Sequence, residues 1–110
     1  MSDWISIAAS DDIPPGHAAR VEIDGTPVAI FNCNGEFYAV DDTCTHAEAS
    51  LSEGELDTES CTVECPLHGS GFDLASGEPT ALPAVLPVRV HSIKVEDGVI
   101  RLLLNEEDAA

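Results

Sequence analysis

The sequence predicts an all-β fold, and two features carry that prediction. Short runs in which apolar and polar residues alternate, as in half-buried strands, recur along both ends of the chain. Several of these runs are joined by Asp-Gly or Asn-Gly, the dipeptides that favour two-residue β-hairpin turns because both residues there adopt a positive φ. We therefore expect antiparallel sheets in which strands that follow each other in the chain are paired.

The expected elements follow in order from these signals. A first strand precedes the turn-forming stretch Asp11–Gly16, whose Asp, Pro and Gly residues favour turns. Asp24-Gly25, Asn34-Gly35 and Asp97-Gly98 then mark three tight turns. The strands expected around them are 4–8, 18–23, 27–32, 36–40, 88–95 and 99–104.

The middle of the chain differs from its ends. Residues 41–83 show little regular pattern and are rich in Thr, Ser, Glu and Gly. Only short strands over 61–64 and 71–74, and a helical turn over 47–51, are expected there. We therefore expect a single domain over residues 1–105, in which residues 1–40 and 84–105 form a β base. The segment of about 41–83 is inserted in this base, and residues 106–110 form a short acidic tail.

The charge of the chain restricts its partners. The 110 residues include 21 acids and 4 bases, for a formal net charge of −17. Nucleic acids and anionic membranes bind basic surfaces, so neither is an expected partner, and the like charge favours a monomer. No base lies between Asp41 and Leu82, where ten acids occur: Asp41, Asp42, Glu48, Glu53, Glu55, Asp57, Glu59, Glu64, Asp73 and Glu78. We expect this field to steer encounters with basic protein surfaces.

The sequence also suggests a location. The first residues lack the positive region and apolar run of a signal peptide. No stretch approaches the roughly 20 apolar residues that span a bilayer. We therefore expect a cytoplasmic protein, in which four cysteines indicate metal ligation more readily than disulfides.

Two short motifs in the inserted segment predict a metal centre. They are Cys44-x-His46 and Cys65-x-x-His68, separated by eighteen residues. Two thiols and two imidazoles favour a 2Fe–2S cluster of the type in which two His replace two Cys on one iron. The alternative is a Cys₂His₂ zinc site, for which the Cys-x-His spacing is tight.

The remaining cysteines and histidines are not expected to be ligands. Cys33 and Cys61 lie in or beside strand-like runs and are interpreted as small buried apolar residues. Cys61 could replace Cys65, but only Cys65 has His68 at the required offset. His17 and His91 are expected at ordinary surface or strand positions.

The sequences CTH and CPLHGSGFD resemble the two binding boxes of Rieske proteins, and the resemblance extends over nearly the whole chain. It implies a Rieske-type fold, with a cluster-binding subdomain inserted in an antiparallel β base. It also implies one 2Fe–2S cluster, with Cys44 and Cys65 on one iron and the Nδ1 atoms of His46 and His68 on the other.

Departures from the high-potential Rieske proteins of respiratory and photosynthetic complexes predict a low potential. Those proteins carry two further cysteines, joined as a disulfide, at positions matched here by Glu48 or Ala49 and by Leu67. Their sulfur-bonding Tyr is matched by Phe72, while their sulfide-bonding Ser is matched by Ser70. Fewer hydrogen bonds to sulfur stabilise the reduced cluster less, so we expect a potential of roughly −150 mV.

The expected function is electron transfer rather than catalysis. Beyond the two motifs the chain shows no second iron site, since His91 is the only His after His68. The resemblance implies a free-standing Rieske ferredoxin of a bacterial aromatic-ring-hydroxylating dioxygenase system, which serves the catabolism of aromatic hydrocarbons. Such a protein takes an electron from an NAD(P)H-dependent flavin reductase and passes it to the terminal oxygenase. We expect both partners to dock transiently at the His46/His68 edge.

Two alternatives remain open at this point. One is a Rieske-type subunit fixed in another redox enzyme, such as a nitrite reductase. The other is a zinc-stabilised interaction module without a redox role.

Overall fold

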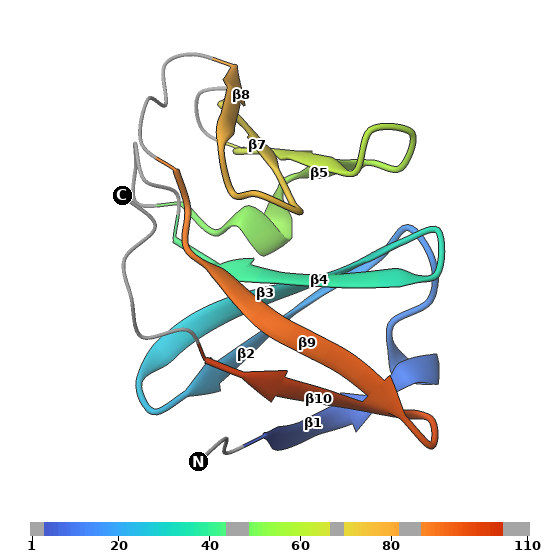
Figure 1. The fold of residues 1–110 in the computed structure, drawn as a ribbon. Coiled ribbons are helices and arrows are strands. Elements are labelled where there is room, and N and C mark those ends of the chain that lie inside the picture. The colour runs from blue at the N-terminus through green and yellow to red at the C-terminus, as the bar shows by residue number, and fades with distance from the viewer. Residues whose placement is uncertain (1–3, 44–48, 67–69, 82–86, 105–110) are drawn as a thin grey trace.

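The computed structural model describes residues 4–43, 49–66, 70–81 and 87–104, and within them it contains ten strands and two short 3₁₀ helices. The strands form two antiparallel sheets, one above the other in Figure 1. The predicted all-β class is confirmed.

The larger sheet is the base, and it joins both ends of the chain (Figure 1). Its strand order is β1-β10-β9-β4-β3-β2, with every neighbouring pair antiparallel. The strands are β1 (Ile5–Ala9), β2 (Ala18–Ile23), β3 (Thr26–Cys33), β4 (Glu36–Asp41), β9 (Val90–Glu96) and β10 (Val99–Leu103). The six strands predicted from the sequence are therefore present, with ends that differ by at most two residues.

The hairpin turns of this sheet have the geometry that their residues favour. Asp24, Asn34 and Asp97 have φ values of 50°, 55° and 52°. The glycine that follows each also has a positive φ. Two successive positive φ values are the mark of the hairpin turn that matches the twist of paired strands. Local turn chemistry thus sets the register of β2 with β3, β3 with β4, and β9 with β10.

The smaller sheet lies within the stretch predicted to carry the metal site. Its order is β5-β6-β7-β8, with strands β5 (Glu55–Asp57), β6 (Thr62–Glu64), β7 (Gly71–Asp73) and β8 (Pro79–Ala81). The sequence predicted β6 and β7, which lead into and out of the second motif, but it did not predict β5 and β8. The 3₁₀ helices are η1 (Ser10–Asp12) and η2 (Leu51–Glu53). The helical turn expected over 47–51 differs from η2, and residues 47 and 48 lie outside the described residues.

Strand β3 is buried on both faces and separates two cores. Val28 and Ile30 point into one core, together with Ile100 and Leu102 of β10. Their neighbours on β3 point the other way, because successive strand residues alternate in direction. There Ala29 and Phe31 join a core completed by side chains from the smaller sheet and its connections: Leu51, Val63, Cys65, Phe72 and Leu74. This second core packs the smaller sheet against β3 and β4.

Gly77 makes a second connection between the sheets. It follows β7 with a φ of 78°, and its carbonyl accepts a hydrogen bond of 2.7 Å from the Val88 amide. A Cβ at Gly77 would collide with the Val88 carbonyl, so only glycine fits. The turn before β8 is thereby fixed against the residues that enter β9.

Candidate metal centre

Of the four predicted ligands, the structure describes Cys65. Cys44, His46 and His68 lie outside the described residues. So does Leu67, which stands where the high-potential Rieske proteins have a disulfide cysteine. What the structure does describe is the protein on either side of each motif, and this part is tightly organised.

The first motif begins and ends at a paired stem. Thr43 and Ser50 form an antiparallel bridge, so the chain leaves and returns at adjacent points. One residue further out on each side, the Leu51 amide donates to the Asp42 carbonyl at 2.7 Å. The segment that carries Cys44 and His46 therefore starts and finishes at two paired residues, Thr43 and Ser50.

The second motif also begins and ends at a paired stem. Glu64 of β6 is opposite Gly71 of β7, and the Cys65 amide donates to the Ser70 carbonyl at 2.6 Å. The Cys65 side chain is buried in the core beside Val63 and Phe72. The segment that contains His68 thus starts and ends at a hydrogen-bonded pair of residues, Cys65 and Ser70.

The two stems pack directly against each other. Gly54, which follows η2, lies against the backbone of Glu64, and a Cβ at Gly54 would collide with the Glu64 carbonyl oxygen. Leu51 and Cys65 share one core. A hollow lined by Glu53, Gly54, Glu64, Cys65 and Pro66 runs between the stems. The structure therefore brings the stems that flank the two motifs to the same end of the molecule.

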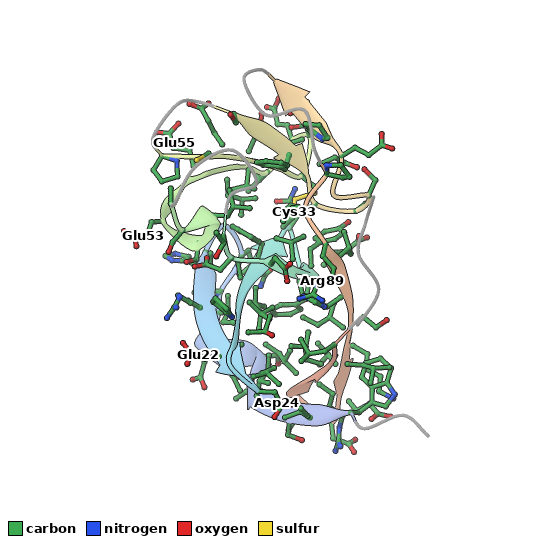
Figure 2. All side chains as sticks on the ribbon, turned by 90° about the vertical axis from the view of Figure 1, so that its left-hand side faces the viewer. Glu22, Asp24, Cys33, Glu53, Glu55 and Arg89 are labelled. Carbon is green, nitrogen blue, oxygen red and sulfur yellow. A yellow bond between two sulfur atoms is a disulfide. The ribbon has the colours of Figure 1, made fainter. Side chains whose placement is uncertain are left out.

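The interpretation of Cys33 and Cys61 as separate buried thiols is wrong. They form a disulfide across 28 residues of sequence, with Cα atoms 5.8 Å apart. The turns that carry them meet, since the Asn34 side-chain amide donates to the Thr58 carbonyl at 2.6 Å. Figure 2 shows Cys33 at the boundary between the two sheets. The sequence could not reveal this pair because two hairpin turns so far apart share no local signal.

This disulfide bears on the choice of ligands. It occupies Cys61, which was the alternative to Cys65, and it leaves Cys65 as a free thiol. A buried free thiol at the end of a hairpin stem, with an imidazole three residues ahead, suits a thiolate ligand to iron. The donor set of two Cys and two His therefore fits a 2Fe–2S cluster.

Two residues beside Cys65 bear on the redox potential. Ser70 is fully buried and provides a hydroxyl next to the second stem. Phe72 is also fully buried, and its ring has no hydroxyl to offer. The low potential expected from this pair stays a prediction.

A polar cluster fixes β4 to β9 just before the first motif. The Asp41 carboxylate accepts hydrogen bonds from His91 Nε2 at 2.7 Å and Arg89 Nε at 3.2 Å. Burial raises the pKa of Asp41, but the hydrogen bonds from His91 and Arg89 outweigh it, so the pKa lies below its ordinary value of 3.8. His91 occupies a strand position, as expected, and has a structural partner there.

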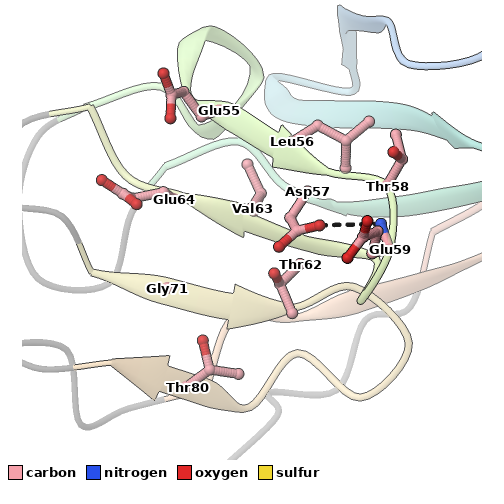
Figure 3. Close-up of a pocket in the computed structure, with 10 residues that line it drawn as sticks. All are labelled: Glu55, Leu56, Asp57, Thr58, Glu59, Thr62, Val63, Glu64, Gly71 and Thr80. Carbon is pink, nitrogen blue, oxygen red and sulfur yellow. Dashed lines mark hydrogen bonds between the residues drawn. The ribbon is translucent and has the colours of Figure 1, made fainter.

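The outer face of the smaller sheet is acidic. Its side chains alternate, so that Leu56, Val63 and Phe72 face the core while their neighbours face outward. Figure 3 shows the resulting shallow hollow, bordered by the acids Glu55, Asp57, Glu59 and Glu64. The Glu59 amide donates to Asp57 at 2.9 Å, and this bond lowers the pKa of the Asp57 carboxyl. The acids expected to produce a negative field are thus exposed together on one face of the smaller sheet.

The four bases lie elsewhere, on or beside the strands of the larger sheet. Arg20 pairs with Asp42 and Glu22, Arg89 with Asp41, and Lys94 and Arg101 with Glu96. Among the ion pairs of the described residues, none neutralises an acid of the smaller sheet. No helix in the described part of the chain is long and apolar enough to cross a membrane.

This arrangement defines a small iron–sulfur protein: two Cys/His motifs on neighbouring stems, carried by a small sheet on a β base. The chain belongs to the Rieske (2Fe–2S) domain family, whose model matches residues 3–93. Its cofactor is accordingly a Rieske-type 2Fe–2S cluster, which excludes the zinc alternative.

Its relatives are electron-transfer components. The chain is 48% identical to the 3-phenylpropionate/cinnamic acid dioxygenase ferredoxin subunit of Escherichia coli K12, over 86% of this chain and 88% of that protein. It is 39% identical to the ferredoxin of carbazole 1,9a-dioxygenase from Nocardioides aromaticivorans IC177, with a TM-score of 0.88 and coverage of 92% and 97%.

Two further solved structures come from a complex with an oxygenase and from a different class of redox enzyme. A complex of reduced oxygenase and oxidised ferredoxin in carbazole 1,9a-dioxygenase contains a chain 38% identical to this one, with a TM-score of 0.86 and coverage of 94% of both chains. A putative NADH-dependent nitrite reductase small subunit from Mycobacterium tuberculosis is 26% identical, with a TM-score of 0.84 and coverage of 97% and 99%. The fold is thus shared by ferredoxins of dioxygenase systems and by a putative nitrite reductase small subunit.

Proposed function

We propose that this chain carries single electrons from an NAD(P)H-dependent flavin reductase to the terminal oxygenase of an aromatic-ring dioxygenase system. The observation that carries the proposal is its 38% identity, over 94% of both chains, to a ferredoxin in complex with its oxygenase. The protein itself performs no chemistry on the aromatic compound, and its role is to accept, hold and release an electron.

Four residues hold the cluster in this proposal. Cys44 and Cys65 bind one iron, and His46 and His68 bind the other. The cluster supplies a one-electron couple, which imidazole ligation raises above that of a cluster with four thiolates. The two paired stems support this assignment, because each brings one Cys/His motif to the same end of the molecule.

The proposed docking site for both partners is the edge that carries His46 and His68. Acids beside the stems, among them Glu53, Glu55 and Glu64, would form its rim and attract basic partner surfaces. A small interface with a polar rim suits a carrier that must release each partner quickly.

We extend the proposal to the organisation and location of the protein. Residues 1–105 form one Rieske domain, in which about 41–83 is the cluster-binding subdomain; the position of β5 to β8 supports this division. The protein is a monomer of the cytoplasm, where NAD(P)H is available to its reductase.

The ligand assignment is tested by two matched cysteine variants. Cys65→Ser removes a proposed ligand, whereas Cys61→Ser, four residues away, removes a disulfide partner. The first should lack iron and the EPR signal of the dithionite-reduced protein, and the second should keep both. Equal loss of iron in the two variants, or zinc in place of iron in the unmodified protein, would refute the assignment.

The role as a diffusing carrier is tested with a dioxygenase system. Addition of the protein to a purified reductase and terminal oxygenase should restore NAD(P)H-dependent product formation, in proportion to its concentration. The alternative of a fixed subunit, favoured by the fold of the nitrite reductase small subunit, predicts instead that the protein co-purifies with one large partner at fixed stoichiometry.

A further inference from the structure

Asp42 is a buried carboxylate two residues before the first proposed ligand. It is 1% exposed, and its amide nitrogen, its carbonyl oxygen and both of its carboxylate oxygens form hydrogen bonds. Its amide donates to the Pro27 carbonyl at 3.0 Å, and its own carbonyl accepts from Leu51 at 2.7 Å. Its carboxylate accepts from the Ser52 amide at 2.9 Å and from Arg20 Nε at 3.1 Å. A buried charge is tolerated only when it is paired in this way.

These contacts connect both ends of the segment that carries Cys44 and His46. Asp42 precedes that segment, whereas Leu51 and Ser52 follow it. A bridge between Thr43 and Ser50 is a single rung, and so short a pairing holds little by itself. The Asp42 side chain adds a charge-assisted bond to the first turn of η2, which stabilises the stem more than a neutral bond would.

Arg20 supplies the opposite charge from another strand. It lies on β2, at the edge of the larger sheet, and its side chain is 47% exposed while that of Asp42 is 2% exposed. Its second contact, to Glu22 at 3.5 Å, is at the surface. The Arg20–Asp42 pair therefore joins the base to the stem of the first motif and cancels the charge buried there.

We infer that Asp42 is a positioning residue for the segment bearing Cys44 and His46, and that Arg20 balances its charge at the stem of that segment. The inference rests on the proposed ligand assignment. Because reduction adds a negative charge to the cluster, a neighbouring negative charge opposes reduction and a neighbouring positive charge favours it. Together the two charges leave the midpoint potential close to the value that an uncharged stem would give. Asp42 alone would lower the midpoint potential, and Arg20 alone would raise it.

The test for charge balance is a set of variants read by the midpoint potential. Asp42→Asn keeps an oxygen that can accept from Ser52 but removes the negative charge, so the midpoint should rise. Arg20→Gln leaves Asp42 unpaired, so the midpoint should fall, and the double variant should lie between the two single variants. Glu22→Gln is the matched control, because it removes the surface partner of the same arginine and should leave the midpoint unchanged.

The test for positioning is iron content and the EPR spectrum. Asp42→Ala, which has no acceptor for Ser52, should lose most of its iron or give a broadened EPR signal, and Asp42→Asn should recover both. If Asp42→Ala does not fold, the opposite shifts of Asp42→Asn and Arg20→Gln still decide the matter.

The outcomes separate this inference from the proposed function. Shifts of both single variants in the same direction, or shifts no larger than that of Glu22→Gln, would overturn the role of the pair while the EPR signal of the unmodified protein remained. A protein without that signal would overturn the ligand assignment and the inference together.

Discussion

Asp41, the last residue of β4, and Asp42, which directly follows it, have carboxylates that serve opposite sides of the molecule. Asp41 turns toward β9, where Arg89 and His91 bind it, and Asp42 turns toward Arg20 and the stem of the first motif. The alternation of a strand explains the difference, because successive side chains point to opposite faces. Asp41 thus connects β4 to β9 within the base, and Asp42 connects the base to the metal-binding segment.

Asp41 should make stability depend on pH in the acid range. Its pKa is lower in the folded protein than its ordinary value of 3.8, so the unfolded chain binds a proton at higher pH. Stability therefore rises with pH across this window, is complete above about pH 4, and is lost as pH falls through the folded pKa. Asp41→Asn should cost about 1–2 kcal/mol at pH 7 and progressively less below about pH 4, as measured by urea unfolding.

Asp24→Asn provides the control for that measurement. Asp24 is exposed in a hairpin turn with a positive φ, which Asn also tolerates well, so its free energy of unfolding should change by less than about 0.5 kcal/mol. The difference in free energy of unfolding between Asp41→Asn and the unmodified protein should shrink on acidification. A constant difference would show that the Asp41 contacts do not depend on its charge.

Single residues also show where sequence reasoning stops. Cys65 could be chosen over Cys61 because the offset to His68 is a local feature. Arg20 and Asp42 could not be paired, since they are 22 residues apart and each resembles an ordinary surface charge. The same limit hid the Cys33–Cys61 disulfide. Partners that come together only through the fold leave no mark on the nearby sequence.

At the scale of elements, predictability follows the length and turn chemistry of each strand. The hairpins of the base were predictable because Asp-Gly and Asn-Gly turns impose a positive φ and fix the register. In contrast, β5 and β8 have three residues each and are held in place by a neighbouring strand and by core contacts. Their existence is a tertiary effect, which a sequence pattern does not carry.

The Cys33–Cys61 disulfide should be the strongest single connection between the base and the smaller sheet. It joins the end of β3 to the turn before β6 and closes a loop of 28 residues. In the chain-entropy account, a loop of this size stabilises the fold by about 3–4 kcal/mol. The double variant Cys33→Ala/Cys61→Ser should lose about this amount in urea unfolding while retaining its iron.

Reduction of the unmodified protein provides a comparison that needs no substitution. A phosphine reductant should bring its unfolding midpoint close to that of the double variant and leave the variant unchanged. If the oxidised protein and the double variant unfolded at the same urea concentration, the disulfide would contribute nothing to the attachment of the smaller sheet.

At the scale of the whole molecule, the charge is divided between two ends. All four bases lie on or beside the strands of the larger sheet, each with an acidic partner there. The acids of the smaller sheet border an open hollow and face solvent (Figure 3). With a net charge of −17, we therefore expect the negative field to be strong over the smaller sheet, where the acids have no basic partner among the described residues.

This division predicts electron transfer that depends strongly on salt. Electrostatic steering raises association rates by about 10- to 1,000-fold, and its range shrinks to roughly 3 Å at 1 M salt. The second-order rate constant for reduction of the oxygenase by this protein should fall by about tenfold or more between about 0.02 M and 0.5 M NaCl. Stopped-flow absorption at each salt concentration measures it.

Two variants that each remove one negative charge test which part of the surface causes this salt dependence. Glu64→Gln neutralises an acid directly before Cys65, and Glu22→Gln neutralises one on the opposite part of the molecule, where Figure 2 shows it well below Glu53 and Glu55. The first should slow the reaction at low salt and flatten its salt dependence, and the second should do so much less. Equal effects would mean that the partner responds to net charge alone, and no salt dependence would exclude electrostatic docking.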